Sequence, residues 1–201
     1  MTRRLILGAT AVLLAAATSA GCVVLPLNVY VAEPGEGTPV YERCSLTPEL
    51  PIGVRVEQNR VSAIVSIVGE QGGLVRVQFD IPEGTTVVLR EGTIRIDAKD
   101  GTPPLLATIA NVNPVAPARY PDTPAIQKLV LPVDAPLHGG RLRFGTSSSD
   151  KHYWIGAPME GANPRDAWIT LPELSVDGTT TRFKAIHFRQ HAALGRVVFN
   201  C

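Results

Sequence analysis

Hydrophobic and polar residues alternate in short runs along most of the chain. In residues 75–81 (VRVQFDI) each apolar residue is followed by a polar one. Side chains of an extended strand point alternately to its two faces, so this pattern predicts a half-buried antiparallel strand. Related short runs, bounded by turn residues, predict further strands at residues 54–57, 61–68, 85–89, 94–98, 105–110, 126–131, 141–144, 168–171, 174–176, 182–191 and 197–201.

Turn residues divide these runs at intervals typical of an all-β protein. Asp177-Gly178 predicts a tight hairpin, and Gln58-Asn59 a second one. Prolines are dense in residues 102–136, which predicts short or edge strands there. We expect about nine to eleven of these runs to form strands, which indicates an antiparallel β-sandwich of immunoglobulin-like architecture, with a lipocalin-like barrel as the alternative.

The run 182–191 changes its phase once. Phe183 and Ala185 share one parity, whereas Ile186 and Phe188 share the other, so a bulge near 185–186 would restore a single apolar face. It would also align Arg182, Lys184, His187 and Arg189 on the opposite face. That basic row is a candidate site for anionic head groups or phosphates, and a solvated strand face is the alternative.

The segment 145–165 is polar and predicts a long loop. Within it, Lys151, His152, Tyr153 and Trp154 form the best candidate for partner binding, because aromatic residues on long loops are enriched at interfaces. The alternative for Trp154 is a place in the core.

No pattern in the chain points to a catalytic centre, a metal ion or a cofactor. His187 and His191 have the i, i+4 spacing of a helical zinc site, but Phe188 stands where the zinc motif has Glu, and the segment reads as a strand. The G-x-S-x-G nucleophile motif is also missing. We therefore expect a binding or accessory protein rather than an enzyme.

The alternative is an envelope hydrolase or a small-ligand carrier. A pocket that holds two or more of His138, His152, His187 and Asp150 would favour this alternative, because catalysis needs side chains that converge in space. A flat surface with Tyr153 and Trp154 exposed would favour binding.

The first 21 residues have the layout of a secretory signal peptide. Arg3 and Arg4 precede an apolar run over 5–17, and small residues follow it. The sequence Ser19-Ala20-Gly21-Cys22 then resembles the lipobox of bacterial lipoproteins, although Ser19 stands where that family most often has Leu. The resemblance implies that Cys22 is acylated and becomes the N-terminus. Ordinary cleavage after Ala20 is the alternative.

This resemblance implies a membrane-anchored protein of the cell envelope. Several acyl chains on one residue give stable anchoring. Val23 and Val24 follow Cys22 where an inner-membrane retention signal would have Asp, which favours the outer membrane, facing the periplasm, in a Gram-negative cell. Loss of Arg3 and Arg4 with the signal leaves 17 of the 19 basic residues against 18 acidic ones. We expect no nucleic-acid partner, because such proteins need a basic surface.

The three cysteines of the chain are Cys22, Cys44 and Cys201. If Cys22 carries lipid, two remain in a compartment where disulfides persist, so we expect a Cys44–Cys201 disulfide. The predicted organisation is a signal peptide at 1–21, a lipidated N-terminus and tether at 22–38, and one β-sandwich domain at 39–201.

Overall fold

The structure is a computed structural model that describes residues 24–42, 45–69, 73–115, 132–144, 147–160 and 164–196. These residues form sixteen strands, and all of the strand pairings are antiparallel. Within them, no helix is long and apolar enough to cross a membrane. The predicted all-β, antiparallel fold class is confirmed.

A seven-stranded sheet forms one layer of the molecule. Its path is β11-β12-β5-β4-β3-β2, and β9 also pairs with β12. The strands are β2 (Thr38–Val40), β3 (Gly53–Gln58), β4 (Val61–Val68), β5 (Leu74–Ile81), β9 (Asn111–Val115), β11 (Arg141–Phe144) and β12 (Ser147–Pro158).

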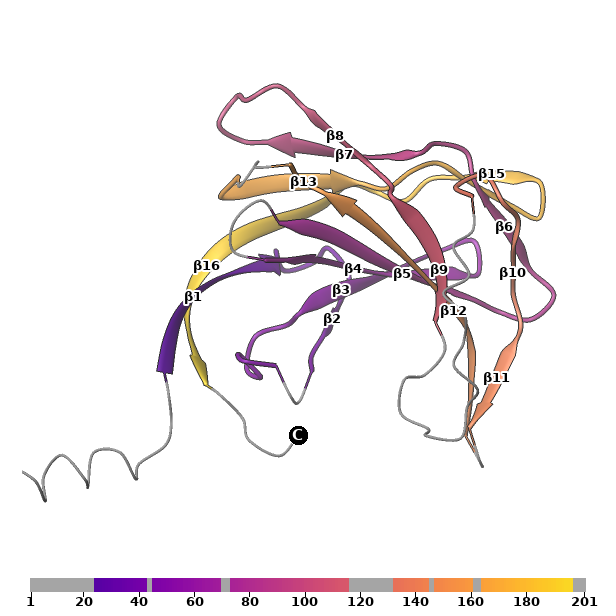
Figure 1. Cartoon of the computed structure of the whole chain (residues 1–201), viewed down its shortest axis with the longest axis horizontal. Helices are drawn as coiled ribbons and strands as arrows, with labels where there is room; N and C mark the ends of the chain where they lie inside the picture. Colours follow the sequence, from indigo (N-terminus) through magenta and orange to yellow (C-terminus); the bar gives the residue numbers. More distant parts are fainter. Residues whose placement is uncertain are drawn as a thin grey trace, which may run out of the picture.

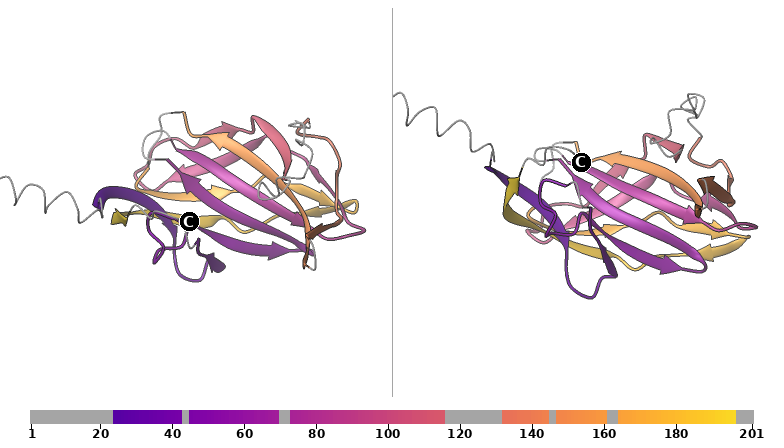
Figure 2. Two further views of the ribbon diagram at one scale, coloured as in Figure 1. Left: turned by 60° about the horizontal axis from the view of Figure 1, so that its bottom comes forward. Right: turned by 90° about the horizontal axis from the view of Figure 1, so that it is seen from below.

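A five-stranded sheet forms the second layer, in the order β1-β16-β13-β7-β8. Its strands are β1 (Val24–Ala32), β7 (Thr93–Ala98), β8 (Leu105–Thr108), β13 (Asp166–Thr170) and β16 (Ile186–Arg196). A four-stranded sheet lies near one end of these layers, as Figures 1 and 2 show, in the order β10-β6-β14-β15. It contains β6 (Thr86–Leu89), β10 (Leu137–His138), β14 (Leu174–Val176) and β15 (Thr179–Thr181).

The chain passes between sheets at short corners. Only residues 109–110 separate β8 of the five-stranded sheet from β9 of the seven-stranded sheet, and the Ala110 amide donates to the Gly156 carbonyl of β12. Strands that switch sheets at such bends are how two layers curl toward a barrel. The fold therefore combines the facing layers of a sandwich with the corners of a partly closed barrel.

One continuous hydrophobic core fills the space between the layers. Phe79 of the seven-stranded sheet and Phe188 of the five-stranded sheet are both fully buried, as are Ile155 and Ile169. The alternation that predicted residues 75–81 as a strand is the alternation of buried and outward side chains in β5. The other face of β5 is thereby left for the polar residues Arg76, Gln78 and Asp80.

The prediction of a tether at 22–38 is wrong for most of its length. Residues 24–32 form β1, which pairs with β16 from Val24–Arg196 to Ala32–Phe188, and Tyr30 is buried. Pro26 is compatible with this strand because β1 is the edge of its sheet, where a proline need not donate to a ladder. The folded domain begins at or before Val24, and not near Pro39.

A further prediction about local structure is also wrong. Residues 147–158, predicted as part of a loop, form β12, the longest strand of the protein's described part. Pairing with distant strands decides this conformation. The prediction of short or edge strands in the proline-dense segment is confirmed for its described residues. β8 has four residues and ends its sheet, and β9 has five residues and pairs only with β12.

Both predicted hairpins exist. Asp177 and Gly178 have φ angles of 48° and 84° between β14 and β15, as a type I′ turn requires. The β3–β4 turn lies one residue later than predicted, at Asn59 and Arg60, with φ angles of 48° and 68°. The predicted bulge near 185–186 is wrong, because residues 182–185 belong to no strand and β16 begins at Ile186. Phe183, Ile186 and Phe188 are nevertheless all buried.

Candidate functional site

A row of polar residues crosses four adjacent strands of the seven-stranded sheet. Glu57 of β3 pairs with Ser62 of β4, Ser62 pairs with Asp80 of β5, and Asp80 pairs with His152 of β12. The residues on either side of this row, such as Phe79 and Tyr153, are buried in the core. Because neighbouring side chains of a strand point to opposite faces, the polar row lies on the outer face of the sheet.

Asp80 is the centre of this row. Its Oδ1 accepts hydrogen bonds from Gln78 Nε2 and His152 Nδ1, both at 2.6 Å. Its Oδ2 accepts from Arg55 Nη1 at 2.8 Å and from the Ser62 hydroxyl at 3.3 Å. We refer to these five side chains as the Asp80 cluster: Arg55, Ser62, Gln78, Asp80 and His152.

The Asp80 cluster holds a buried carboxylate in its ionised form. Only 9% of the Asp80 side chain is exposed. Burial raises the pKa of the Asp80 carboxyl, but the hydrogen bonds from His152 and Gln78 and the charges of His152 and Arg55 outweigh it, so the pKa lies below its ordinary value. Four donors from four strands therefore fix this group in one orientation.

The chemistry of Ser62 and His152 is set by their separate contacts with Asp80. The Ser62 hydroxyl accepts a hydrogen bond from Arg55 at 2.8 Å and donates to Oδ2, while His152 contacts Oδ1. A nucleophilic serine needs a hydrogen bond to its base. Here serine and histidine bind different oxygens of one carboxylate, so the arrangement positions polar groups rather than activating the hydroxyl.

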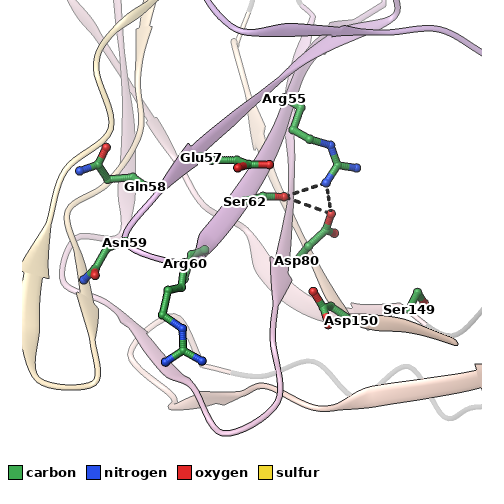
Figure 3. A pocket seen from close by; sticks show the side chains of 10 residues that line it. Arg55, Glu57, Gln58, Asn59, Arg60, Ser62, Asp80, Ser149 and Asp150 are labelled. Atoms are coloured by element: carbon green, nitrogen blue, oxygen red, sulfur yellow. Dashed lines mark hydrogen bonds and ion pairs between the residues drawn. The ribbon is translucent and has the colours of Figure 1, made fainter.

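An open cavity of about 630 Å³ lies beside the Asp80 cluster. Figure 3 shows Arg55 reaching across to Ser62 and Asp80, with Asp150 and Ser149 of β12 on the far side. The side chains that line the cavity are almost all polar or charged: Arg55, Glu57, Gln58, Asn59, Arg60, Val61, Ser62, Asp80, Ser149 and Asp150. Such a surface suits a polar ligand or partner better than an apolar one.

The four residues named as an indicator of a catalytic or carrier pocket do not gather in this cavity. Asp150 lines it, and His152 contacts its lining residue Asp80. His138 instead contacts the Thr86 hydroxyl at 3.3 Å, and His187 lies on the other sheet. The condition of two converging residues is therefore not met.

The condition for a flat aromatic binding surface is not met either. Tyr153 is buried, and its hydroxyl donates to the His138 carbonyl at 2.9 Å. Trp154 is half-buried on the outer face, with the Arg76 guanidinium 5.3 Å from the centre of its ring. The prediction of an exposed 151–154 loop is wrong because β5 and β9 pair with β12 on either side of these residues.

The basic row of Arg182, Lys184, His187 and Arg189 is exposed except for the half-buried His187. Only His187 and Arg189 lie on a strand, so the row is not one strand face as predicted. Each member contacts an acidic residue. Arg182 pairs with Glu173, and Lys184 lies 3.8 Å from Glu36. Arg189 contacts Glu33 at 3.1 Å and Asp166 at 3.4 Å. The row is thus charge-balanced, which favours the solvated face over an anion site.

His187 is held between two neighbours on β13. Its ring stacks on Trp168, with centroids 4.3 Å apart and planes within 4°, and its Nε2 contacts Asp166. The hydrogen bond from His187 lowers the pKa of the Asp166 carboxyl, and the charges of His187, Lys99 and Arg189 act in the same direction against a smaller effect of burial. His191, its i+4 neighbour, is exposed, and no three His, Cys, Asp or Glu side chains among the described residues gather as metal ligands would.

Three predicted sites lie outside the described residues. They are the lipidated Cys22 and the two disulfide partners Cys44 and Cys201. Their modification stays a prediction.

Sequence reasoning did not identify the centre of the Asp80 cluster. Arg55, Gln78 and Asp80 appeared only as the outward positions of two predicted strands. The only signal in the sequence was that these strands have polar residues on one face. Which of those residues contact one another depends on the register between β3, β4, β5 and β12. No protein-family model, curated protein or solved structure matches the chain, so the site is interpreted from its own geometry.

Proposed function

We propose that this protein is a lipid-anchored binding or accessory protein of the bacterial cell envelope, and that it binds its partner through the outer face of β3, β4, β5 and β12. The observation that carries the binding surface is the Asp80 carboxylate, which four donors hold beside a polar cavity. Polar groups ordered before association lose little conformational entropy on binding, which favours recognition.

Site-specific photocrosslinking in intact envelopes tests this surface. A photoreactive residue in place of Glu57, which is exposed at the cavity, should capture a discrete partner. The same residue in place of Glu91, an exposed glutamate at a turn before β7, is the matched control. Equal or absent capture at the two positions would count against the outer face as a binding surface.

The anchor rests on the lipobox-like sequence that ends at Cys22. Two or three acyl chains there would hold the protein stably at the membrane, facing the periplasm and favouring the outer membrane. Intact mass of the membrane fraction should show an acylated chain that begins at Cys22. An unmodified chain that begins at Gly21 would show ordinary signal cleavage instead.

The disulfide belongs to the same proposal. An exported chain whose Cys22 carries lipid has Cys44 and Cys201 left to pair. Peptide maps made with and without a reductant should differ at these two residues. Two free thiols would refute the bridge.

A small-ligand carrier is the second candidate. The cavity of about 630 Å³ falls within the size range of ligand pockets, about 300–1,000 Å³, although its lining is more polar than most. Native mass spectrometry of the protein taken from envelopes would reveal a retained small molecule. A hydrolase has less support, because the Ser62 hydroxyl bonds to Asp80 and Arg55 rather than to His152.

A further inference from the structure

The end of β1 is joined almost directly to the proposed anchor. β1 begins at Val24, two residues after Cys22. Two residues of fully extended chain span at most about 7 Å, so acyl chains on Cys22 would enter the bilayer close to the start of this strand. A flexible tether of seventeen residues would have left the domain free to turn, but β1 takes up most of that length.

The start of β1 and the end of β16 extend past the other strands of their sheet. β13 pairs with β16 only over residues 186–189, whereas β1 continues to pair with it as far as Arg196. Residues 24–30 and 190–196 therefore form a two-stranded ribbon, which projects beyond the sheet in Figure 1. We call this part the β1–β16 ribbon.

The β1–β16 ribbon carries apolar side chains on both of its faces, beside the polar residues Asn28, Gln190, His191 and Arg196. On one face Pro26 pairs with Leu194, and both residues are exposed, Leu194 to 65%. On the other face the Leu27 side chain lies over Gly195, and Leu46 packs beside the same glycine while remaining 43% exposed. A strand at a protein–water boundary ordinarily has one polar face. Exposed apolar side chains on both faces of this end suit a lipid–water interface, where the polar residues can stay in water.

Two further features of this end agree with a lipid surface. An apolar groove of about 400 Å³ lies between the ribbon and residues 46–52, lined by side chains that include Leu27, Val29, Leu46 and Ile52. The sequence of the ribbon contains no Asp or Glu, so no carboxylate would have to be removed from water.

We infer that the β1–β16 ribbon, with Leu46 beside it, inserts into the surface of the lipid bilayer that holds the anchor. This inference rests on the proposed acylation of Cys22 and deepens it. The acyl chains keep the protein at the membrane, and the leucines fix its orientation, because burying their side chains in the interface is favourable only when this end faces the lipid.

Labelling of two matched leucine positions tests the inference. Leu194 and Leu106 are exposed to 65% and 60% and lie on β16 and β8, near opposite edges of the five-stranded sheet. The full-length acylated protein, carrying Leu194→Cys or Leu106→Cys, is placed in phosphatidylethanolamine–phosphatidylglycerol vesicles and treated with a charged maleimide. Labelling of the unsubstituted protein gives the background from Cys44 and Cys201.

Because the two positions are similarly open to water in the protein alone, a rate ratio near one is expected without a membrane contact. Insertion predicts that the Leu194→Cys variant is labelled at least about tenfold more slowly than the Leu106→Cys variant. Leu46→Cys, at the other face of the ribbon, should also be labelled slowly. Slow labelling at both positions would show that the result at position 194 does not come from a local change in structure there.

Intact mass of the same samples separates the two proposals. An acylated chain with slow labelling at positions 194 and 46 supports insertion. An acylated chain labelled equally at 194 and 106 overturns insertion and leaves the anchor in place. A chain without acyl groups overturns the anchor, and the inserted ribbon with it.

Discussion

The Asp80 cluster and the basic row at 182–189 are both networks of charged residues on the outside of the molecule, yet they differ in burial. In the cluster, the Asp80 side chain is 9% exposed and accepts hydrogen bonds from four neighbours. In the row, the Lys184 side chain is 85% exposed and lies 3.8 Å from its partner. A charge pair contributes little where water competes, whereas an unpaired buried charge is costly. Two groups of charged residues that look alike in the sequence can therefore contribute very differently to the stability of the folded protein.

The largest expected effect comes from removing the buried carboxylate. Asp80→Ala leaves the donors of Arg55, Gln78 and His152 without their acceptor, so we expect the free energy of unfolding to fall by about 2–3 kcal/mol. Urea unfolding followed by tryptophan fluorescence measures this change.

The matched control for that variant is Asp97→Ala. Asp97 also pairs with an arginine, Arg95, at 2.8 Å, but the side chains of Arg95 and Asp97 are 55% and 32% exposed. We expect a loss below about 0.5 kcal/mol. Similar losses in the two variants would mean that burial does not separate the two kinds of pair.

We expect an effect of intermediate size on the free energy of unfolding when the pH is lowered. The pKa of Asp80 is lowered in the folded state, where hydrogen bonds from His152 and Gln78 outweigh burial. A carboxylate with a lowered folded pKa stabilises the protein above its unfolded pKa of about 3.9, and this contribution is lost as the pH falls toward the folded value. The stability difference between the unsubstituted protein and Asp80→Asn should therefore shrink below about pH 4.

Urea unfolding of both proteins at pH 7, 5 and 3 measures that difference. It should stay nearly constant from pH 7 to 5 and become smaller at pH 3. A difference that is unchanged at pH 3 would show that Asp80 keeps its ordinary pKa in the folded protein.

The smallest effect is expected in the basic row. Lys184→Ala removes a long ion pair with Glu36, 3.8 Å, in which the lysine is 85% exposed although the glutamate is only 15% exposed. We expect the free energy of unfolding to change by less than about 0.5 kcal/mol, because the lysine charge stays in water. Adding 0.5 M salt should leave even this difference undetectable, because salt screens exposed charges. A loss above about 1 kcal/mol would mean that the basic row contributes to the free energy of unfolding as the Asp80 cluster does.

Predictions about single strands succeeded where the signal is local. The alternation in residues 75–81 and the turn pair Asp177-Gly178 are read within a few residues, and both are present in the structure. Predictions failed where a distant partner decides. Residues 147–158 have weak strand signals of their own, but pairing with β11, β5 and β9 makes them the long strand β12.

The amino-acid sequence by itself determined the all-β class, most strand positions and the outward direction of Arg55, Gln78 and Asp80. It also contains the lipobox-like motif on which the anchor proposal rests. Only the tertiary structure brought Asp80 and His152 together, since they are 72 residues apart and meet through the register of β5 and β12. Side-chain alternation is a property of one strand, whereas register is a property of two strands whose pairing depends on the whole core.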